Sequence, residues 1–111
     1  MAGVVHLPVY ATGFRGDDIQ AALEQLAPIS LRYGATRYEV FRSRDDRYRF
    51  LMAIDFDNHA DWDAFWFGEE FTDWRAACMS WYQVPLLYVW QDLVARGGVH
   101  EQVAAGEALD E

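Results

Sequence analysis

The chain has 111 residues, of which 52% are hydrophobic and 24% charged, and its 18 acidic residues against nine arginines, with no lysine, give a formal net charge of −9. This length fits one globular domain with its own core, and the single cysteine excludes an intramolecular disulfide framework. The acidic balance disfavours nucleic acid as a partner, and no apolar run approaches the roughly 20 residues that span a bilayer, so we expect a cytoplasmic protein without a membrane partner.

The first part of the chain is typical of a strand followed by a helix. Residues 4–10 form a β-favouring apolar run. Asp17 and Gln20 have the spacing of a capping box, which predicts a helix start, and Gly34 is the expected stop. Pro28 lacks an amide donor, so we expect a kink or a short final turn there.

The middle of the chain predicts a β-hairpin. Apolar and polar residues alternate over residues 35–43, and residues 48–56 form a second β-favouring run. The short polar stretch 44–47 between them is a tight connection.

The second half predicts a helix, a strand and a tail. Asn58 stands three residues before Asp61, which favours a helix start, and Gly68 interrupts the aromatic face that follows. Residues 84–90 are expected to form the last strand. The polar, acidic residues 97–111 are expected to be a flexible tail after a domain of residues 1–96.

The resulting order is β-α-β-β-α-β, an α+β fold of the ferredoxin-like type, with a four-stranded antiparallel sheet and two helices on one face. Residues 50–54 and 85–90 are apolar on both sides, which indicates that the second face of the sheet is also covered. No further element remains to cover it. We therefore expect a homodimer in which two sheets pack face to face as a barrel.

The chain also resembles a known superfamily over residues 4–94. Asp55-Phe56 at a strand end, Ala60-Asp61-Trp62 and Phe65-Trp66 in the next helix, and residues 69–75 are similar to the dimeric α+β barrel proteins that include the antibiotic-biosynthesis monooxygenases. The resemblance implies the same fold and pairing. Relatives include cofactor-independent oxygenases of polycyclic phenols, heme-degrading oxygenases, lactone isomerases and proteins with no known chemistry.

The heme-degrading branch implies particular residues, and this chain departs from them. The tryptophan position falls at Phe65 and the iron-binding histidine at Arg75, while the first strand offers His6 instead of asparagine. His59 would serve as a ligand only in a rearranged pocket. We therefore expect no cofactor, with heme as a less favoured alternative.

Two histidines are candidate catalytic bases. His6 lies on the first strand, on the side opposite Val5 and Leu7, and a histidine beside a cavity can remove a proton from a phenol near neutral pH. His59 falls in the first turn of the second helix. For each, the alternative is a structural or solvated histidine. The acids around His59 lack the glycine of a calcium loop and are explained by helix capping, so we expect no metal.

All five tryptophans lie between residues 62 and 90. They either form a core layer or line a flat apolar pocket, which suits an aromatic ligand. The candidate substrate-binding residues are Trp62, Trp66, Trp74, Tyr38 and Tyr88.

Two hypotheses follow. The first is a monooxygenase-like or isomerase-like enzyme, without a nucleotide cofactor, that acts on a hydrophobic or phenolic small molecule. The second is a non-catalytic dimeric module that binds a ligand or is purely structural. A heme-handling oxygenase is the least favoured alternative. The enzyme hypothesis requires a pocket next to His6 or His59.

Overall fold

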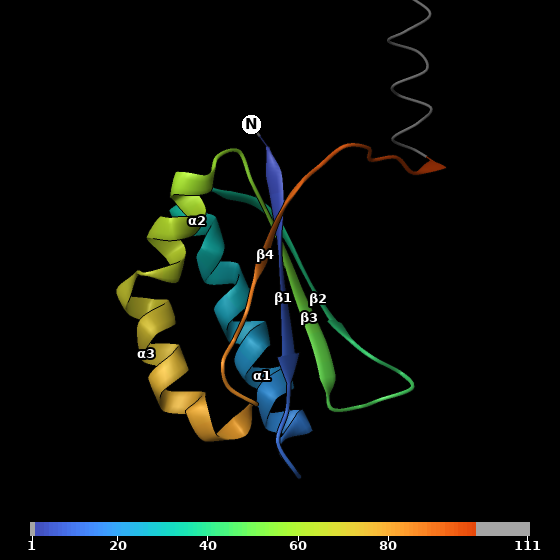
Figure 1. Cartoon of the computed structure of the whole chain (residues 1–111), viewed down its shortest axis with the longest axis vertical. Coiled ribbons are helices and arrows are strands. Elements are labelled where there is room, and N and C mark those ends of the chain that lie inside the picture. The colour runs from blue at the N-terminus through green and yellow to red at the C-terminus, as the bar shows by residue number, and fades with distance from the viewer. Residues whose placement is uncertain (1, 100–111) are drawn as a thin grey trace, which may run out of the picture.

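Four strands form one antiparallel sheet in the order β2-β3-β1-β4, and the helices cover one of its faces (Figure 1). The computed structural model describes residues 2–99. In chain order the elements are β1 (Gly3–Tyr10), α1 (Gly16–Leu26), the 3-10 helix η1 (Ala27–Tyr33), β2 (Ala35–Arg42), β3 (Arg49–Phe56), α2 (His59–Trp66), α3 (Glu69–Cys78), the 3-10 helix η2 (Met79–Trp81) and β4 (Val89–Asp92). The predicted ferredoxin-like α+β fold is confirmed.

The first helix ends as predicted but begins differently. The α-helix gives way to η1 next to Pro28, and Gly34 terminates η1 with a φ of 102°. The predicted capping box at Asp17 is wrong, because the N-cap residue is Arg15 and no side chain caps the helix. The Asp17 carboxylate instead accepts a hydrogen bond from Arg42 Nη1 at 2.8 Å, so a partner 25 residues away replaces the local one.

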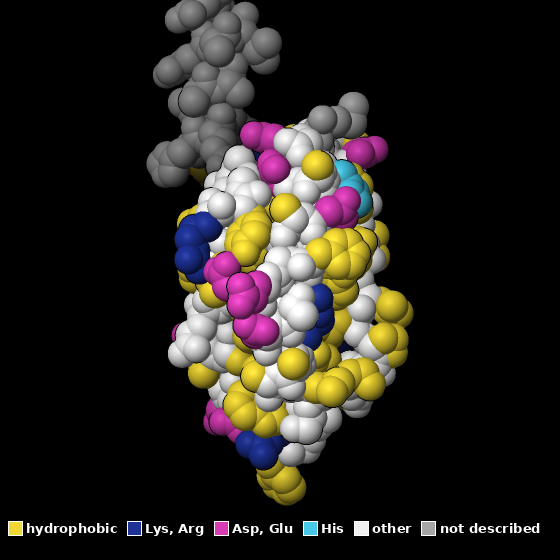
Figure 2. Space-filling view, turned by 90° about the vertical axis from the view of Figure 1, so that its left-hand side faces the viewer, with side chains coloured by type: hydrophobic (Ala, Val, Ile, Leu, Met, Phe, Trp, Pro, Cys, Tyr) yellow, Lys and Arg dark blue, Asp and Glu magenta, His cyan; other side chains and the backbone are white. Residues whose placement is uncertain are grey.

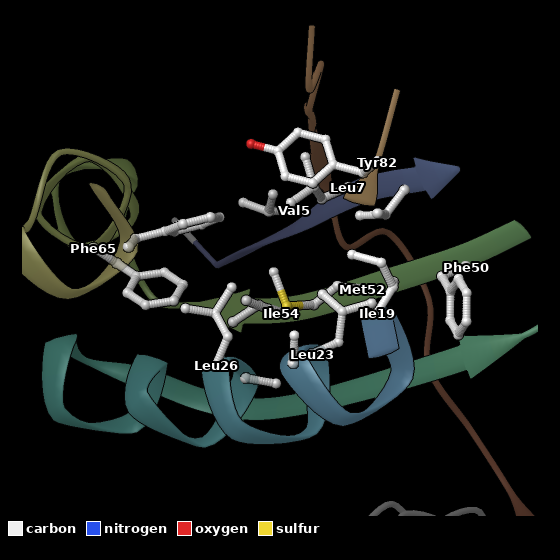
Figure 3. Packing of buried hydrophobic residues seen from close by; sticks show 14 of the residues in the cluster. Val5, Leu7, Ile19, Leu23, Leu26, Phe50, Met52, Ile54, Phe65 and Tyr82 are labelled. Carbon is white, nitrogen blue, oxygen red and sulfur yellow. The ribbon is translucent and has the colours of Figure 1, made fainter. Parts of the chain in front are cut away.

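The core lies between the sheet and the helices. Strand β1 pairs with β3 so that Val5 lies opposite Ile54 and Leu7 opposite Met52, and all four side chains are buried. They meet the apolar residues of α1, among them Leu23 (Figure 3). Because strand residues alternate between faces, His6 points to the opposite face, as predicted.

The predicted second helix is divided in two. Asn58 caps α2, since its side chain accepts a hydrogen bond from the amide of Asp61 at 3.1 Å, and Gly68 is the N-cap of α3. Both positions match the sequence prediction.

The last strand is shorter and later than predicted. We expected a strand over residues 84–90, whereas β4 comprises Val89–Asp92 and pairs with β1 only as far as His6. Continuing that register would place Pro8 of β1 opposite Leu87. Pro85 precedes Leu87 by two residues in the segment that would extend β4. Neither proline has an amide hydrogen, so the ladder ends where they would have to donate.

The outer face of the sheet, opposite the helices, is apolar over much of its area. Leu51 and Ala53 of β3 lie on it, as does Val4 of β1, with the exposed side chains of Phe41 and Val89 towards its edges. In residues 2–99 no helix is long and apolar enough to cross a membrane. The predicted tail lies largely outside the described residues, which end at residue 99.

Candidate functional site

The centre of the candidate site is a group of five aromatic rings, which we call the aromatic cluster: Trp62, Phe65 and Trp66 of α2, Phe71 of α3, and Tyr88 just before β4. The Tyr88 ring lies 4.8 Å from that of Trp62 and 5.2 Å from that of Trp66, between ring centroids. Phe71 lies 5.1 Å from Trp66. Trp62 has no exposed surface, so the cluster is part of the core as well as a possible site.

The other two predicted substrate-binding residues lie outside this cluster. Trp74 contacts Phe71 at 5.8 Å, stacks on Tyr82 and donates its indole hydrogen to the Ala22 carbonyl at 3.2 Å. Tyr38 lies on β2, which is one edge strand of the sheet, whereas Tyr88 directly precedes β4, which is the other edge strand. Three of the five predicted residues are therefore together, one adjoins them and one is remote.

Arg75 completes the site, and the sequence reasoning did not identify it as a binding residue. Its guanidinium carbon lies 4.0 Å from the centre of the Trp66 ring and 4.7 Å from that of Phe71, in cation–π geometry. One guanidinium nitrogen, Nη2, donates to the Trp66 carbonyl at 2.8 Å. The i, i+4 spacing of Phe71 and Arg75 on α3 was the available signal.

Two buried donors at this site have no acceptor within the described part of the chain: Nη1 of Arg75 and the indole nitrogen of Trp62. Arg75 also has no carboxylate within ion-pairing distance in residues 2–99, and burial lowers the pKa of its guanidinium. An unpartnered buried donor is destabilising by about 1–3 kcal/mol. Both residues border Trp66, so the aromatic cluster offers hydrogen-bond donors in an apolar surrounding.

The two candidate bases lie on opposite faces of the sheet. His59 begins α2, with its Nδ1 3.0 Å from a carboxylate oxygen of Asp63 and its ring 4.9 Å from that of Trp90. His6 lies on the outer face, where its Nδ1 is 2.8 Å from the side-chain amide of Gln91. His59 is one helical turn from Trp62, whereas the sheet separates His6 from the aromatic cluster.

The hollows of the surface lie elsewhere. The outer groove, of about 520 Å³, runs between the end of β1 and the chain that precedes β4, and is lined by Pro8, Val9, Tyr10, Arg49, Gln83, Val84, Pro85 and Leu87. A second hollow of about 390 Å³ lies between α1 and α3. Neither is lined by a histidine or by Trp62. On the side formed by α2 and α3, apolar side chains are interspersed with acidic ones (Figure 2). None of these hollows reaches the aromatic cluster, which is closed in this structure. The pocket next to His6 or His59 that the enzyme hypothesis requires is therefore not open here.

Heme does not fit the residues at this site. Arg75 stands where the resemblance would place the iron-binding histidine, and its guanidinium is stacked on Trp66 and offers no lone pair to a metal. No group of three or more histidine, cysteine or acidic side chains within residues 2–99 is placed to hold a metal ion.

Cys78 is a packed thiol. It ends α3, is 6% exposed, and burial raises the pKa of its thiol. A raised pKa keeps the thiol protonated and unreactive near neutral pH. We assign it no chemistry.

The fold defined by this sheet and helix layer is shared with solved structures described as antibiotic biosynthesis monooxygenases, which confirms the fold that the resemblance in the sequence implied. A candidate antibiotic biosynthesis monooxygenase from Nitrosomonas europaea is similar with a TM-score of 0.75 and 20% identity, covering 86% of this chain and 94% of its own. A protein from Deinococcus radiodurans with the same description gives a TM-score of 0.75 at 14% identity, covering 87% of this chain and 97% of its own.

A third similar structure is a variant of SnoaB from Streptomyces nogalater, which is described as a cofactor-independent oxygenase. Its TM-score is 0.71 at 13% identity, and the match covers 88% of this chain and 96% of that one. No family model matches the sequence, and no curated protein matches it significantly. At such identities the likeness establishes the fold.

Proposed function

We propose that this protein is a monooxygenase-like enzyme that acts, without a bound cofactor, on a hydrophobic or phenolic small molecule held in the aromatic cluster. The observation that carries the proposal is the pair of unpartnered buried donors, Arg75 Nη1 and the Trp62 indole nitrogen, among aromatic rings. A flat ligand with oxygen atoms would stack on the rings and accept both hydrogen bonds. The shared fold with oxygenases such as SnoaB supports this assignment.

Arg75 would supply the electrostatic part of the reaction. A fixed positive charge in a desolvated site favours the ionised form of a neighbouring phenol and so lowers the pKa of that phenol. A preorganised donor aimed at a developing oxyanion is worth about 10²–10³ in rate in enzymes where it has been removed. The Trp66 and Phe71 rings hold the guanidinium in place.

His59 is the base that this arrangement favours. In the tautomer that donates Nδ1–H to Asp63, its Nε2 is free to accept a proton, and the residue stands one turn from Trp62. His6 would have to act from the other face of the sheet. The deprotonated substrate then reacts with dioxygen: oxygen adds to a ring carbon, and loss of water from the hydroperoxide leaves a carbonyl. One oxygen atom of O2 enters the product and the other leaves as water.

A second candidate function is a non-catalytic module, and the complete burial of Trp62 favours it. In that case the cluster would only pack, or would bind a ligand without turnover. The outer face of the sheet supports pairing in either case, because it exposes Phe41, beside Leu51, and Val89 on β4. We propose that a second copy covers it to form a homodimer.

Oxygen uptake with a panel of polycyclic phenols, such as dihydroxynaphthalenes, tests the proposal. We expect consumption of dioxygen above the uncatalysed rate, and a loss of about 10–100-fold in kcat/KM for Arg75→Gln. His59→Ala should lose turnover while phenol binding persists. A loss in His6→Ala with none in His59→Ala would reverse the assignment of the base.

The non-catalytic alternative gives a different result in the same experiments. A module that only binds would show quenching of tryptophan fluorescence by the phenols without oxygen uptake. If the phenols cause neither quenching nor oxygen uptake, the aromatic cluster has a purely structural role.

A further inference from the structure

We infer that residues 83–88 form a lid over the aromatic cluster, with Tyr88 as the plug that must leave before a ligand can enter. The inference rests on the proposed function, since it concerns access to the same site. The cluster is closed in the structure, with Tyr88 against Trp62 and Trp66. A ligand therefore needs one of the surrounding elements to move.

The backbone of this segment is held only at its two ends. At the first end, Gln83 donates its amide hydrogen to the Tyr10 carbonyl at 2.8 Å, and Tyr82 forms an isolated bridge with Ala11. At the other end, Val89 begins the ladder with β1. Within the described part of the chain, residues 84–88 make no backbone hydrogen bond between these points. Segments with exposed, unpaired backbone open at low free energy.

The side chains of the lid divide between two sides. Tyr88 and Leu86 are half-buried and pack against the core, whereas Val84 is 63% and Leu87 70% exposed. The Tyr88 hydroxyl makes no hydrogen bond to another described residue, so apolar packing, including its contacts with Trp62 and Trp66, holds its ring. Its displacement would break no polar interaction.

The opposite wall of the cluster is fixed much more firmly. Glu70, in the first turn of α3, accepts a hydrogen bond from the Tyr33 hydroxyl at 2.7 Å. The Trp74 indole donates a hydrogen bond to the Ala22 carbonyl of α1 at 3.2 Å, and Arg75 Nη2 donates one to the Trp66 carbonyl at 2.8 Å. Moving α3 would break all three hydrogen bonds, so the lid is the element that opens.

There is also room for the movement. The outer groove, of about 520 Å³, lies along the lid and is lined by Val84, Pro85 and Leu87 from the lid itself. The groove separates these residues from Pro8, Tyr10 and Arg49 on its other wall. The lid can therefore swing away from the cluster, which exposes the faces of Trp62 and Trp66, and a closing lid also excludes water from the bound ligand.

Stopped-flow binding of N-phenyl-1-naphthylamine, a neutral dye that fluoresces in apolar surroundings, tests the lid on the full chain. The observed rate should level off at high dye concentration, because lid opening becomes limiting. Tyr88→Ala should bind at least about tenfold faster, without a plateau, because the plug is gone. Tyr88→Phe keeps the ring that closes the cluster and should therefore keep the plateau in the observed rate. The matched control is Leu87→Ala, which shortens the neighbouring outward side chain and should also leave the rate unchanged.

The results that overturn the lid are distinct from those that overturn the site. If the dye binds but the rates of Tyr88→Ala and the original protein agree, or if Leu87→Ala accelerates binding equally, the lid is refuted and the site stands. If the dye binds to none of the proteins, Tyr88→Ala included, both proposals fail. Tyr88→Leu gives the same comparison should Tyr88→Ala not fold by circular dichroism.

Discussion

Replacing Trp62 by phenylalanine separates the structural role of the aromatic cluster from its binding role. Trp62 is completely buried, and its indole hydrogen has no acceptor within residues 2–99. Trp74 offers a matched control, because its indole hydrogen is donated to the Ala22 carbonyl at 3.2 Å. The same chemical change thus removes an unpartnered donor at one position and a hydrogen bond at the other.

The two substitutions should differ in their effect on the free energy of unfolding. Trp62→Phe removes roughly 40 Å³ of buried ring, which costs about 2 kcal/mol in cavity and transfer terms. Removing the unpartnered donor stabilises the folded state by about 1–3 kcal/mol, so the net change in the free energy of unfolding should be close to zero. Trp74→Phe loses less packing, because Trp74 is partly exposed, but it also loses a hydrogen bond, and together these cost about 2 kcal/mol.

Urea unfolding followed by far-ultraviolet circular dichroism measures both values independently of the tryptophan count, provided that the slope m is unchanged. Trp74→Phe should be the less stable variant by about 1–2 kcal/mol. If Trp62→Phe is instead the less stable by more than about 1 kcal/mol, its indole hydrogen has a partner in solution and the argument for a vacant donor fails.

Three further predictions concern other parts of the molecule. Gly34→Ala should lower the free energy of unfolding by about 1–2 kcal/mol, because φ is 102° at this position and the new Cβ would lie 2.6 Å from a carboxylate oxygen of α2. Gly13→Ala is the control, because a Cβ at Gly13 would lie in open space and should not lower stability. Thermal unfolding of the two variants compares them. The hydrogen bond from Tyr10 lowers the pKa of Asp46 below its ordinary 3.8. The hydrogen bond therefore stabilises the protein above pH 3.8, and this stabilisation is lost as the pH falls through the lower pKa of the folded state. Urea unfolding should show that the stability difference between the original protein and Tyr10→Phe shrinks between neutral pH and about pH 2. Leu51→Arg, on the outer face, should give a folded monomer in sedimentation equilibrium, and a dimer of unchanged affinity would contradict pairing through that face.

The parts of the fold that could be predicted from the sequence depend on local signals. Gly34 and Asn58 act within one turn of the chain, and the β-favouring runs of residues 35–43 and 48–56 predicted the two paired strands β2 and β3. Asp17 failed as a cap because Arg42, far along the chain, binds its carboxylate. The start of β4 was misplaced because Pro8, on a different strand, has no amide hydrogen to extend the ladder.

The candidate site was only partly predictable for the same reason. The concentration of tryptophans in one stretch indicated an aromatic layer, and Trp62, Trp66 and Tyr88 do lie together. The missing acceptor at Nη1 of Arg75 depends on which groups surround it after folding, and no spacing in the sequence contains that information. The sequence therefore predicted the aromatic rings of the cluster but not the position of the Arg75 guanidinium against Trp66 and Phe71.

The protected state of Cys78 makes the protein suitable for site-specific labelling. It is the only cysteine of the chain, and its thiol is both shielded and held protonated. A maleimide dye would therefore react selectively with a thiol introduced at an exposed position, such as Leu87→Cys, without prior removal of the native one. Fluorescence from that single label would report the position of the chain beside Pro85 in real time, molecule by molecule.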